Sequence, residues 1–194
     1  MTDIAAGLAD PPHDSQRLFR AVLEAFSHPG RIVCLPDPPA AAAPLSQAAT
    51  AFVLTLVDRD TPLWLAPAFD SEPVRDFARF HTGSPIAKQP ADALFAVVTL
   101  DGMPSLDSFA IGTDPYPDRS ATLVIELPSL VGGPKRKWRG PGIQDQQTVG
   151  LPGLTDSFWQ SWTANRALFP CGVDLVFAAG ADLVALPRGI AVES

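Results

Sequence analysis

The stretch IGTDPYPDRSATLVIELPSLVGGPKRKWRGPGI, residues 111–143, decides how the rest of the chain is organised. Ala121–Leu127 has the density of β-branched and aliphatic residues that is typical of a central strand. Gly132-Gly133-Pro134 then predicts a turn into the basic strand Lys135–Arg139, which ends at the loop Gly140-Pro141-Gly142. We therefore expect a central strand followed by a stiff hairpin over 132–143 that projects from the fold.

Helical and strand patterns alternate on both sides of this stretch. A helix is expected after a cap at Asp14 or Ser15, and apolar residues recur at helical spacing from Leu18 to Phe26. The other expected helices are 45–57, 72–80 and one within 152–169, and the expected strands are 31–35, 61–66, 93–100 and a hairpin of 173–178 with 183–186. This interleaving predicts an α/β fold, with a mixed sheet between helices as a three-layer sandwich. Residues 1–13 are expected to be a flexible lead-in and residues 14–194 a single domain.

Composition argues against several classes of partner. The chain of 194 residues carries 21 acidic and 14 basic side chains, a net charge of −7, whereas nucleic acids and anionic membranes select basic surfaces. No apolar run approaches the roughly 20 residues that span a bilayer. The first residues carry Asp3 and Asp10, whereas a signal peptide begins with a positively charged region. Cys34 and Cys171 lack metal or redox spacing. We expect a cytoplasmic protein that contacts neither nucleic acid nor membrane.

One candidate catalytic group is His81 in His81-Thr82-Gly83, at the end of the expected helix 72–80. It could project into a cleft beside Ser84, but a histidine at a helix C-terminus is also favoured simply as a cap, and that interpretation is preferred. The three histidines show no spacing that would build a metal site. No metal ligands are therefore assigned.

A second candidate lies in the basic strand and the loop after it. Lys137, Arg139 and the backbone of Gly140 and Gly142 could form a concave anion site. An ordinary tight turn on a basic strand explains the same residues and is preferred, because neither phosphate-loop glycine motif is present. The dispersed carboxylates offer no acid–base pair. From the residues alone, no catalytic constellation emerges.

Short segments in a fixed order nevertheless resemble a known family. They are Phe19-Arg20 to Ser27-His28-Pro29-Gly30, Leu54–Asp58 to Thr61–Leu65, Phe80–Gly83, Gly112-Thr113 to Tyr116-Pro117, Ser120–Val124, Gly140–Ile143, Asn165 to Phe169–Leu175, and Ala185–Arg188. Together they resemble the PhnH family, the H subunit of the bacterial carbon–phosphorus lyase core complex. Cys171 and Gly189-Ile190 depart from the family pattern.

This resemblance implies a role in organophosphonate catabolism. The core complex joins subunits of the G, H, I and J types and supports formation of ribose 1-alkylphosphonate 5-triphosphate from ATP and alkylphosphonate. The H subunit has no assigned chemistry of its own. The resemblance also implies a fold like the large domain of pyridoxal-phosphate-dependent transferases without the cofactor. The three lysines, Lys88, Lys135 and Lys137, offer no evident Schiff-base position, so no cofactor is expected.

Two hypotheses of different classes follow. The preferred one is an accessory, non-catalytic subunit of a transferase or lyase complex that acts through contact with G-, I- and J-type subunits, with a homodimer as its state in isolation. The alternative is a phosphate- or nucleotide-binding domain with cryptic enzymatic activity, in which Lys137, Arg139 and the Gly140 and Gly142 amides hold a phosphate near His81. A degenerate pyridoxal phosphate enzyme is a third possibility.

Overall fold

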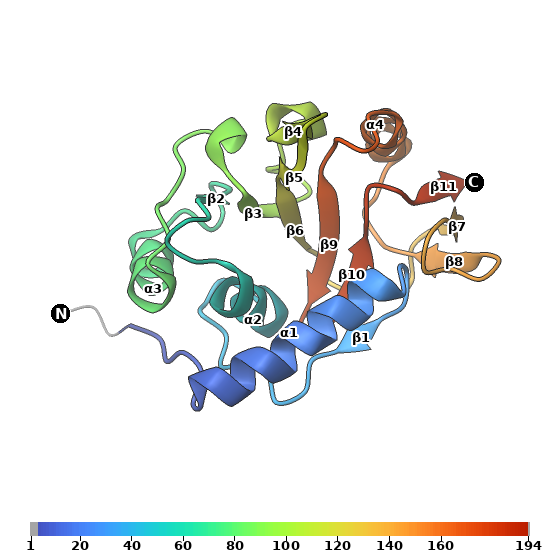
Figure 1. The fold of residues 1–194 in the computed structure, drawn as a ribbon. Coiled ribbons are helices and arrows are strands. Elements are labelled where there is room, and N and C mark those ends of the chain that lie inside the picture. The colour runs from blue at the N-terminus through green and yellow to red at the C-terminus, as the bar shows by residue number, and fades with distance from the viewer. Residues whose placement is uncertain (1–3, 194) are drawn as a thin grey trace.

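A mixed six-stranded sheet forms the centre of the protein (Figure 1). The structure, a computed structural model, describes residues 4–193. The strand order is β1-β10-β9-β6-β3-β2, in which β2, β3, β6 and β9 run parallel and β10 and β1 are antiparallel additions. Their bounds are β1 (Val33–Cys34), β2 (Leu63–Leu65), β3 (Phe95–Thr99), β6 (Thr122–Glu126), β9 (Asp174–Ala179) and β10 (Asp182–Leu186). The predicted mixed sheet and the predicted 173–186 hairpin are confirmed.

Helices cover both faces of this sheet. The helices are α1 (Pro11–Ser27), α2 (Gln47–Leu56), α3 (Glu72–Thr82) and α4 (Asp156–Ala167), with 3₁₀ turns η1 (Pro90–Asp92) and η2 (Leu106–Ser108). Phe52 of α2 packs edge-on against Phe95 of β3, with ring centroids 5.7 Å apart, whereas Phe158 of α4 packs on Phe177 of β9 at 6.2 Å. The strand register puts Phe95 and Phe177 on opposite faces. Since α1 and α3 both contact α2, the helices form two layers. The finer likeness to pyridoxal phosphate transferases stays a prediction.

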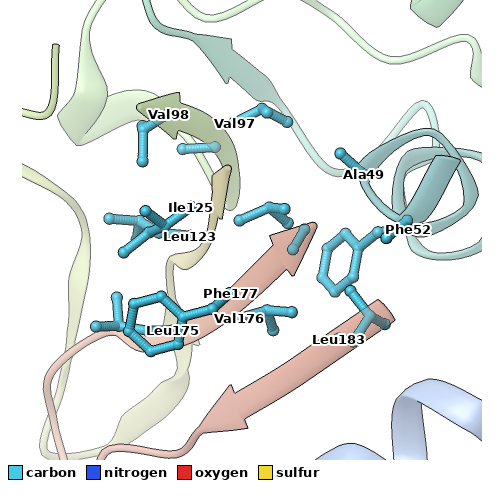
Figure 2. Packing of buried hydrophobic residues seen from close by; sticks show 14 of the residues in the cluster. Ala49, Phe52, Val97, Val98, Leu123, Ile125, Leu175, Val176, Phe177 and Leu183 are labelled. Atoms are coloured by element: carbon cyan, nitrogen blue, oxygen red, sulfur yellow. The ribbon is translucent and has the colours of Figure 1, made fainter. Parts of the chain in front are cut away.

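The central strands are buried on both faces, as Figure 2 shows for side chains on either side of β6 and β9. Leu123 and Ile125 point to one face, while Val97 and Val176 lie toward α2 on the other. All four are at most 1% exposed. Parallel strands covered by helices on both sides need apolar residues at every position, which explains the unbroken apolar runs in the sequence.

The basic strand after β6 belongs to a different sheet. β7 (Lys135–Arg139) pairs with β8 (Gln147–Gly150) and β11 (Ala191–Glu193), and a separate ribbon joins β4 (Ile111–Thr113) and β5 (Tyr116–Ser120). The predicted hairpin over 132–143 is therefore wrong, because β7 forms its hairpin with β8. Trp138 explains the arrangement: it is 0% exposed and its ring lies 6.4 Å from Trp159 of α4, whereas Lys137 and Arg139 point to solvent. A strand with one buried and one exposed face is typical of a small antiparallel sheet that has one face in solvent.

The first helix begins earlier than predicted. Pro11 and Pro12 occupy its first two positions, where a missing N–H costs nothing, and the Asp10 amide donates to Asp14 Oδ2 at 2.9 Å. Asp14 thus lies inside the helix, and the predicted lead-in over 1–13 is wrong from Pro11 onward. Ala5 and Leu8 pack against the core, while residues 1–3 lie outside the described residues. A single domain over 14–194 stays a prediction.

A half-buried carboxylate connects the central strand to α2. Glu126, the last residue of β6, accepts a hydrogen bond from the Ser46 amide at 2.7 Å. Ser46 caps α2, and its hydroxyl accepts from the Ala49 amide at 3.1 Å. Burial raises the pKa of Glu126, and the hydrogen bonds from Ser46 offset part of that rise.

We predict that Glu126→Gln removes a pH-dependent part of the stability. Because the pKa of Glu126 is raised above its ordinary value of 4.5, the native state binds the proton more tightly than the unfolded chain. Its contribution is full below that value and is lost as pH rises through the raised pKa. Denaturant unfolding across weakly acidic to neutral pH should show E126Q gaining stability relative to the wild type as pH rises. A constant difference between the two proteins would contradict this.

Candidate functional site

An apolar hollow of about 500 Å³ opens at the surface where α1 ends. It is formed by segments far apart in the sequence, and prolines make up much of its wall. The lining residues are Phe26, Ser27, Pro117, Asp118, Pro141, Gly142, Phe169, Pro170, Pro187, Arg188, Gly189 and Ile190. We call it the proline-lined hollow. Because a proline ring has no backbone N–H and a fixed φ, such a wall is stiff and offers few donors.

Arg188 holds three of these segments together. Its Nε donates to Asp174 Oδ1 at 3.1 Å and its Nη2 to Asp174 Oδ2, while its backbone amide donates to Oδ1 at 2.7 Å. Its Nη1 donates to the Pro117 carbonyl at 3.0 Å. The Arg188 and Asp174 side chains are 15% and 17% exposed. A forked, charge-assisted pair of this kind fixes geometry as well as charge. Arg188 therefore positions the wall of the hollow.

The Gly140-Pro141-Gly142 loop forms another part of the wall. Gly142 has φ +85°, and a Cβ there would lie 2.3 Å from the Ser27 carbonyl oxygen at the end of α1. A Cβ on Gly140 would lie 2.8 Å from Ile190 Cδ1. Only glycine permits both the backbone conformation and this close packing. The loop is consequently locked between α1 and the segment before β11.

Phe169 projects from the loop after α4 and is 66% exposed. The loop is held by Asn165, which is buried: its Oδ1 accepts from the Val173 amide at 2.8 Å and its Nδ2 donates to the Val173 carbonyl at 2.9 Å. The Asn165 side chain thus bonds both the backbone N–H and the backbone C=O of Val173, and this pair of bonds closes the loop between α4 and β9. Phe169 is thus presented to solvent on a fixed support.

The outer flank of α1 extends the same apolar surface. Phe19, Leu23 and Phe26 recur at helical spacing and share one side of the helix, and Phe26 lines the hollow. Phe19 is 42% and Leu23 47% exposed, whereas the buried side of α1 consists of Leu18, Ala21, Val22 and Ala25. The apolar residues that recur from Leu18 to Phe26 are therefore divided between the core and the surface. We call the proline-lined hollow together with Phe19 and Leu23 the docking surface.

His81, Thr82 and Gly83 form the C-terminal end of α3, but the preferred interpretation of His81 as its cap is wrong, because His81 lies inside the helix. Gly83 caps α3 at φ +72°, and the Thr82 hydroxyl donates to the Ala78 carbonyl at 2.6 Å. His81 Nε2 donates to the Ala5 carbonyl at 2.9 Å, so the imidazole anchors the segment before α1. The Ser84 hydroxyl donates to the Thr61 carbonyl at 2.8 Å. His81 and Ser84 are therefore each engaged elsewhere.

Lys137 and Arg139 lie on the exposed face of the small sheet. Arg139 donates to Gln146 Oε1 at 3.0 Å and lies 3.6 Å from Glu193 Oε2, while Lys137 is directly opposite Glu193 in the β7–β11 pairing. Neither residue lines the proline-lined hollow, although Pro141 and Gly142 do. α3, which carries His81, lies at the other end of the molecule from β7 (Figure 1). The predicted set is thus divided between two distant places.

No group of three or more histidine, cysteine, aspartate or glutamate side chains within residues 4–193 is arranged to hold a metal ion. Across the same residues, no helix has the length and apolar character needed to cross a membrane. Cys34 and Cys171 are both free.

Sequence reasoning identified part of the docking surface. The Gly140-Pro141-Gly142 loop was a candidate, but the roles of Arg188, Phe169 and the α1 flank were missed. A signal was present: several segments that carry the family resemblance, distant from one another in the chain, meet at the hollow. The sequence alone could not show that these segments lie next to one another, because they are far apart in the chain.

Comparisons with known proteins agree with that resemblance. Residues 6–193 match the sequence profile of the family described as bacterial phosphonate metabolism protein (PhnH). The chain is 40% identical over 190 residues to alpha-D-ribose 1-methylphosphonate 5-triphosphate synthase subunit PhnH of Rhizobium meliloti (strain 1021), covering 97% of this chain and 95% of that protein. It is 30% identical over 174 residues to the putative C-P lyase subunit protein HtxG of Stutzerimonas stutzeri, covering 89% and 83%.

We predict that Asn165→Ala lowers the free energy of unfolding by roughly 2–3 kcal/mol, because it leaves the Val173 amide and carbonyl buried without their partner. Denaturant unfolding followed by circular dichroism measures the change. Thr163→Ala is a control on the same helix, since its hydroxyl only donates to the Trp159 carbonyl within α4. Equal losses in both variants would show that Asn165 has no special role in holding the loop.

Proposed function

Because the chain belongs to the PhnH family of bacterial phosphonate metabolism proteins, we propose that it is an accessory subunit of a carbon–phosphorus lyase core complex. In this role it supports formation of ribose 1-alkylphosphonate 5-triphosphate from ATP and alkylphosphonate. It acts in the cytoplasm and contributes binding surface rather than catalytic groups. The names of both relatives, a synthase subunit and a putative C-P lyase subunit, support this proposal.

The docking surface is the observation that carries the proposal. A monomeric protein rarely leaves several large apolar side chains exposed together around a rigid concave site. Here Phe19, Leu23 and Phe169 are all exposed, and Phe169 stands at the edge of the proline-lined hollow. Aromatic side chains at the centre of an interface contribute much of its binding energy. Phe169 and the hollow together have the form of such a centre.

The chemistry of the hollow favours docking over catalysis. The charged groups that line it are Asp118 and Arg188, and Arg188 already binds Asp174 and the Pro117 carbonyl. An arginine whose donors are used in this way positions the wall and is not available to stabilise a reacting group. The alternative of a phosphate site on Lys137, Arg139 and the Gly140–Gly142 loop has less support, because Glu193 faces both cations and the loop is packed against α1.

We infer that another subunit of the same complex, of the G, I or J type, binds to the docking surface. Both relatives carry the word subunit in their names, which argues for a partner of a different kind. A second copy of this chain is the competing occupant. It would cover the same surface only when the partner subunits are absent, as the expected homodimer in isolation.

We predict that Phe169→Ser weakens association with the partner subunits at least tenfold, about the loss expected when an aromatic anchor leaves an interface centre. Copurification after co-expression with the neighbouring subunits, followed by a binding titration, measures it. Phe80→Ser is the matched control, since Phe80 is 70% exposed but lies on α3, away from the hollow.

The result separates the two occupants. Loss of copurification by F169S with F80S unchanged supports a partner subunit on the docking surface. If F169S still copurifies fully and only loses self-association in size-exclusion chromatography, the surface belongs to a homodimer and the assignment fails. Turnover of ATP and methylphosphonate by the isolated chain would overturn the accessory role itself.

A further inference from the structure

A second hollow lies beside β2, an edge strand of the main sheet. Its volume is about 380 Å³, within the range of small-molecule sites. It is lined by Trp64, Leu65, Asp70, Arg75, Arg79, Ile86, Ala87 and Lys88. We call it the cationic hollow. None of these residues belongs to the docking surface.

Three cations and one carboxylate meet in this hollow. Arg75 is fixed by Asp70, whose Oδ1 accepts from Arg75 Nε at 2.5 Å and whose carbonyl accepts from Nη2 at 3.3 Å. Arg79 and Lys88 are exposed and form no ion pair with any carboxylate in residues 4–193. Two positive charges of the hollow are therefore uncompensated.

Two separate segments bring these charges together. Arg75 and Arg79 are four residues apart on α3, a spacing at which like charges repel. The C-terminus of the helix favours Arg79 by itself. Lys88 comes from a different segment, which is held in place because the Ala87 amide donates to the Leu63 carbonyl of β2 at 2.8 Å. Helix stability does not explain why Lys88 lies beside two arginines.

The chain as a whole is acidic, and a further group of cations, on the strand Lys135–Arg139, faces Glu193. The net charge of the chain is −7 and it has only 14 lysines and arginines, so the local field of the cationic hollow attracts anions against the charge of the whole molecule. Trp64 supplies an apolar wall, since it is half-buried and one edge of its ring packs on Phe109 at 5.7 Å. A concave site with an indole wall and forked donors suits a small anion better than a flat protein surface.

We propose that the cationic hollow binds a multiply charged phosphate group, as in an organic polyphosphate, with Arg79 and Lys88 as its direct ligands. Arg75 contributes its remaining donors from the position that Asp70 fixes. Trp64 packs against whatever part of the ligand extends from the phosphates. The site lies at the β2 edge of the sheet and functions independently of the docking surface (Figure 1).

The test uses tripolyphosphate as probe and isothermal titration calorimetry at fixed ionic strength. Replacing both direct ligands, Arg79→Gln with Lys88→Gln, should raise Kd at least tenfold, because the variant loses two charge-assisted contacts to the phosphates. The matched control is Lys135→Gln with Lys137→Gln, which removes two exposed cations of the small sheet and changes the net charge equally. The control should stay within about twofold of the wild type.

Trp64 provides a second readout. The other tryptophans, Trp138, Trp159 and Trp162, are buried, so a fluorescence change on adding tripolyphosphate should report Trp64 and disappear in Trp64→Phe. Absence of binding at millimolar tripolyphosphate overturns the proposal. Equal weakening in both double variants also overturns it, since attraction would then follow overall charge alone. Citrate that binds as tightly, with the same dependence on Arg79 and Lys88, would reject phosphate as the ligand class.

Discussion

The ion pair between Arg188 and Asp174 is the constraint on which the docking surface depends. It joins the segment after β10 to the start of β9, and through the Pro117 carbonyl it also holds β5. A partly buried pair of this kind adds little net stability, because desolvation offsets most of the attraction. The pair matters for geometry more than for stability, because a planar guanidinium donates its hydrogen bonds in fixed directions and so fixes the positions of its acceptors. The proline-lined hollow keeps its shape for that reason.

Rigid support and exposed apolar side chains are combined throughout this surface. Asn165 fixes the loop that carries Phe169, and Gly142 locks the neighbouring loop against the end of α1. A side chain that is already held in place loses little entropy when a partner covers it, so binding costs less. This arrangement suits a subunit whose contribution to a complex is a preformed interface. It also explains why the molecule needs no acid–base pair or metal cluster to have a role.

The two hollows share no lining residue and differ in character. The hollow near α1 is apolar, and its arginine is internally compensated by Asp174. The hollow beside β2 has two uncompensated cations, Arg79 and Lys88. Protein contact and anion binding can therefore occupy the same subunit without interfering.

Short-range patterns were enough to predict most elements. The unbroken apolar run before Leu100 predicted a buried strand, which the structure confirms as β3. The same reasoning failed where one pattern fits two arrangements. The sequence of Lys135–Arg139 predicts a strand but not the sheet to which it belongs. The burial of Trp138 against α4 decides that. The apolar residues from Leu18 to Phe26 on α1 likewise did not reveal that only some of them would be buried.

By itself, therefore, the sequence determined the α/β class, the stiffness of the glycine–proline loop and the ordered segments of the family, since each depends on residues close together in the chain. Only the tertiary structure decided that this loop, Phe169 and Arg188 form one surface, and that Arg79 and Lys88 share another. Arg188 and its acceptor at Pro117 are 71 residues apart. No periodicity or local propensity encodes such a contact, because it exists only after the strands have paired.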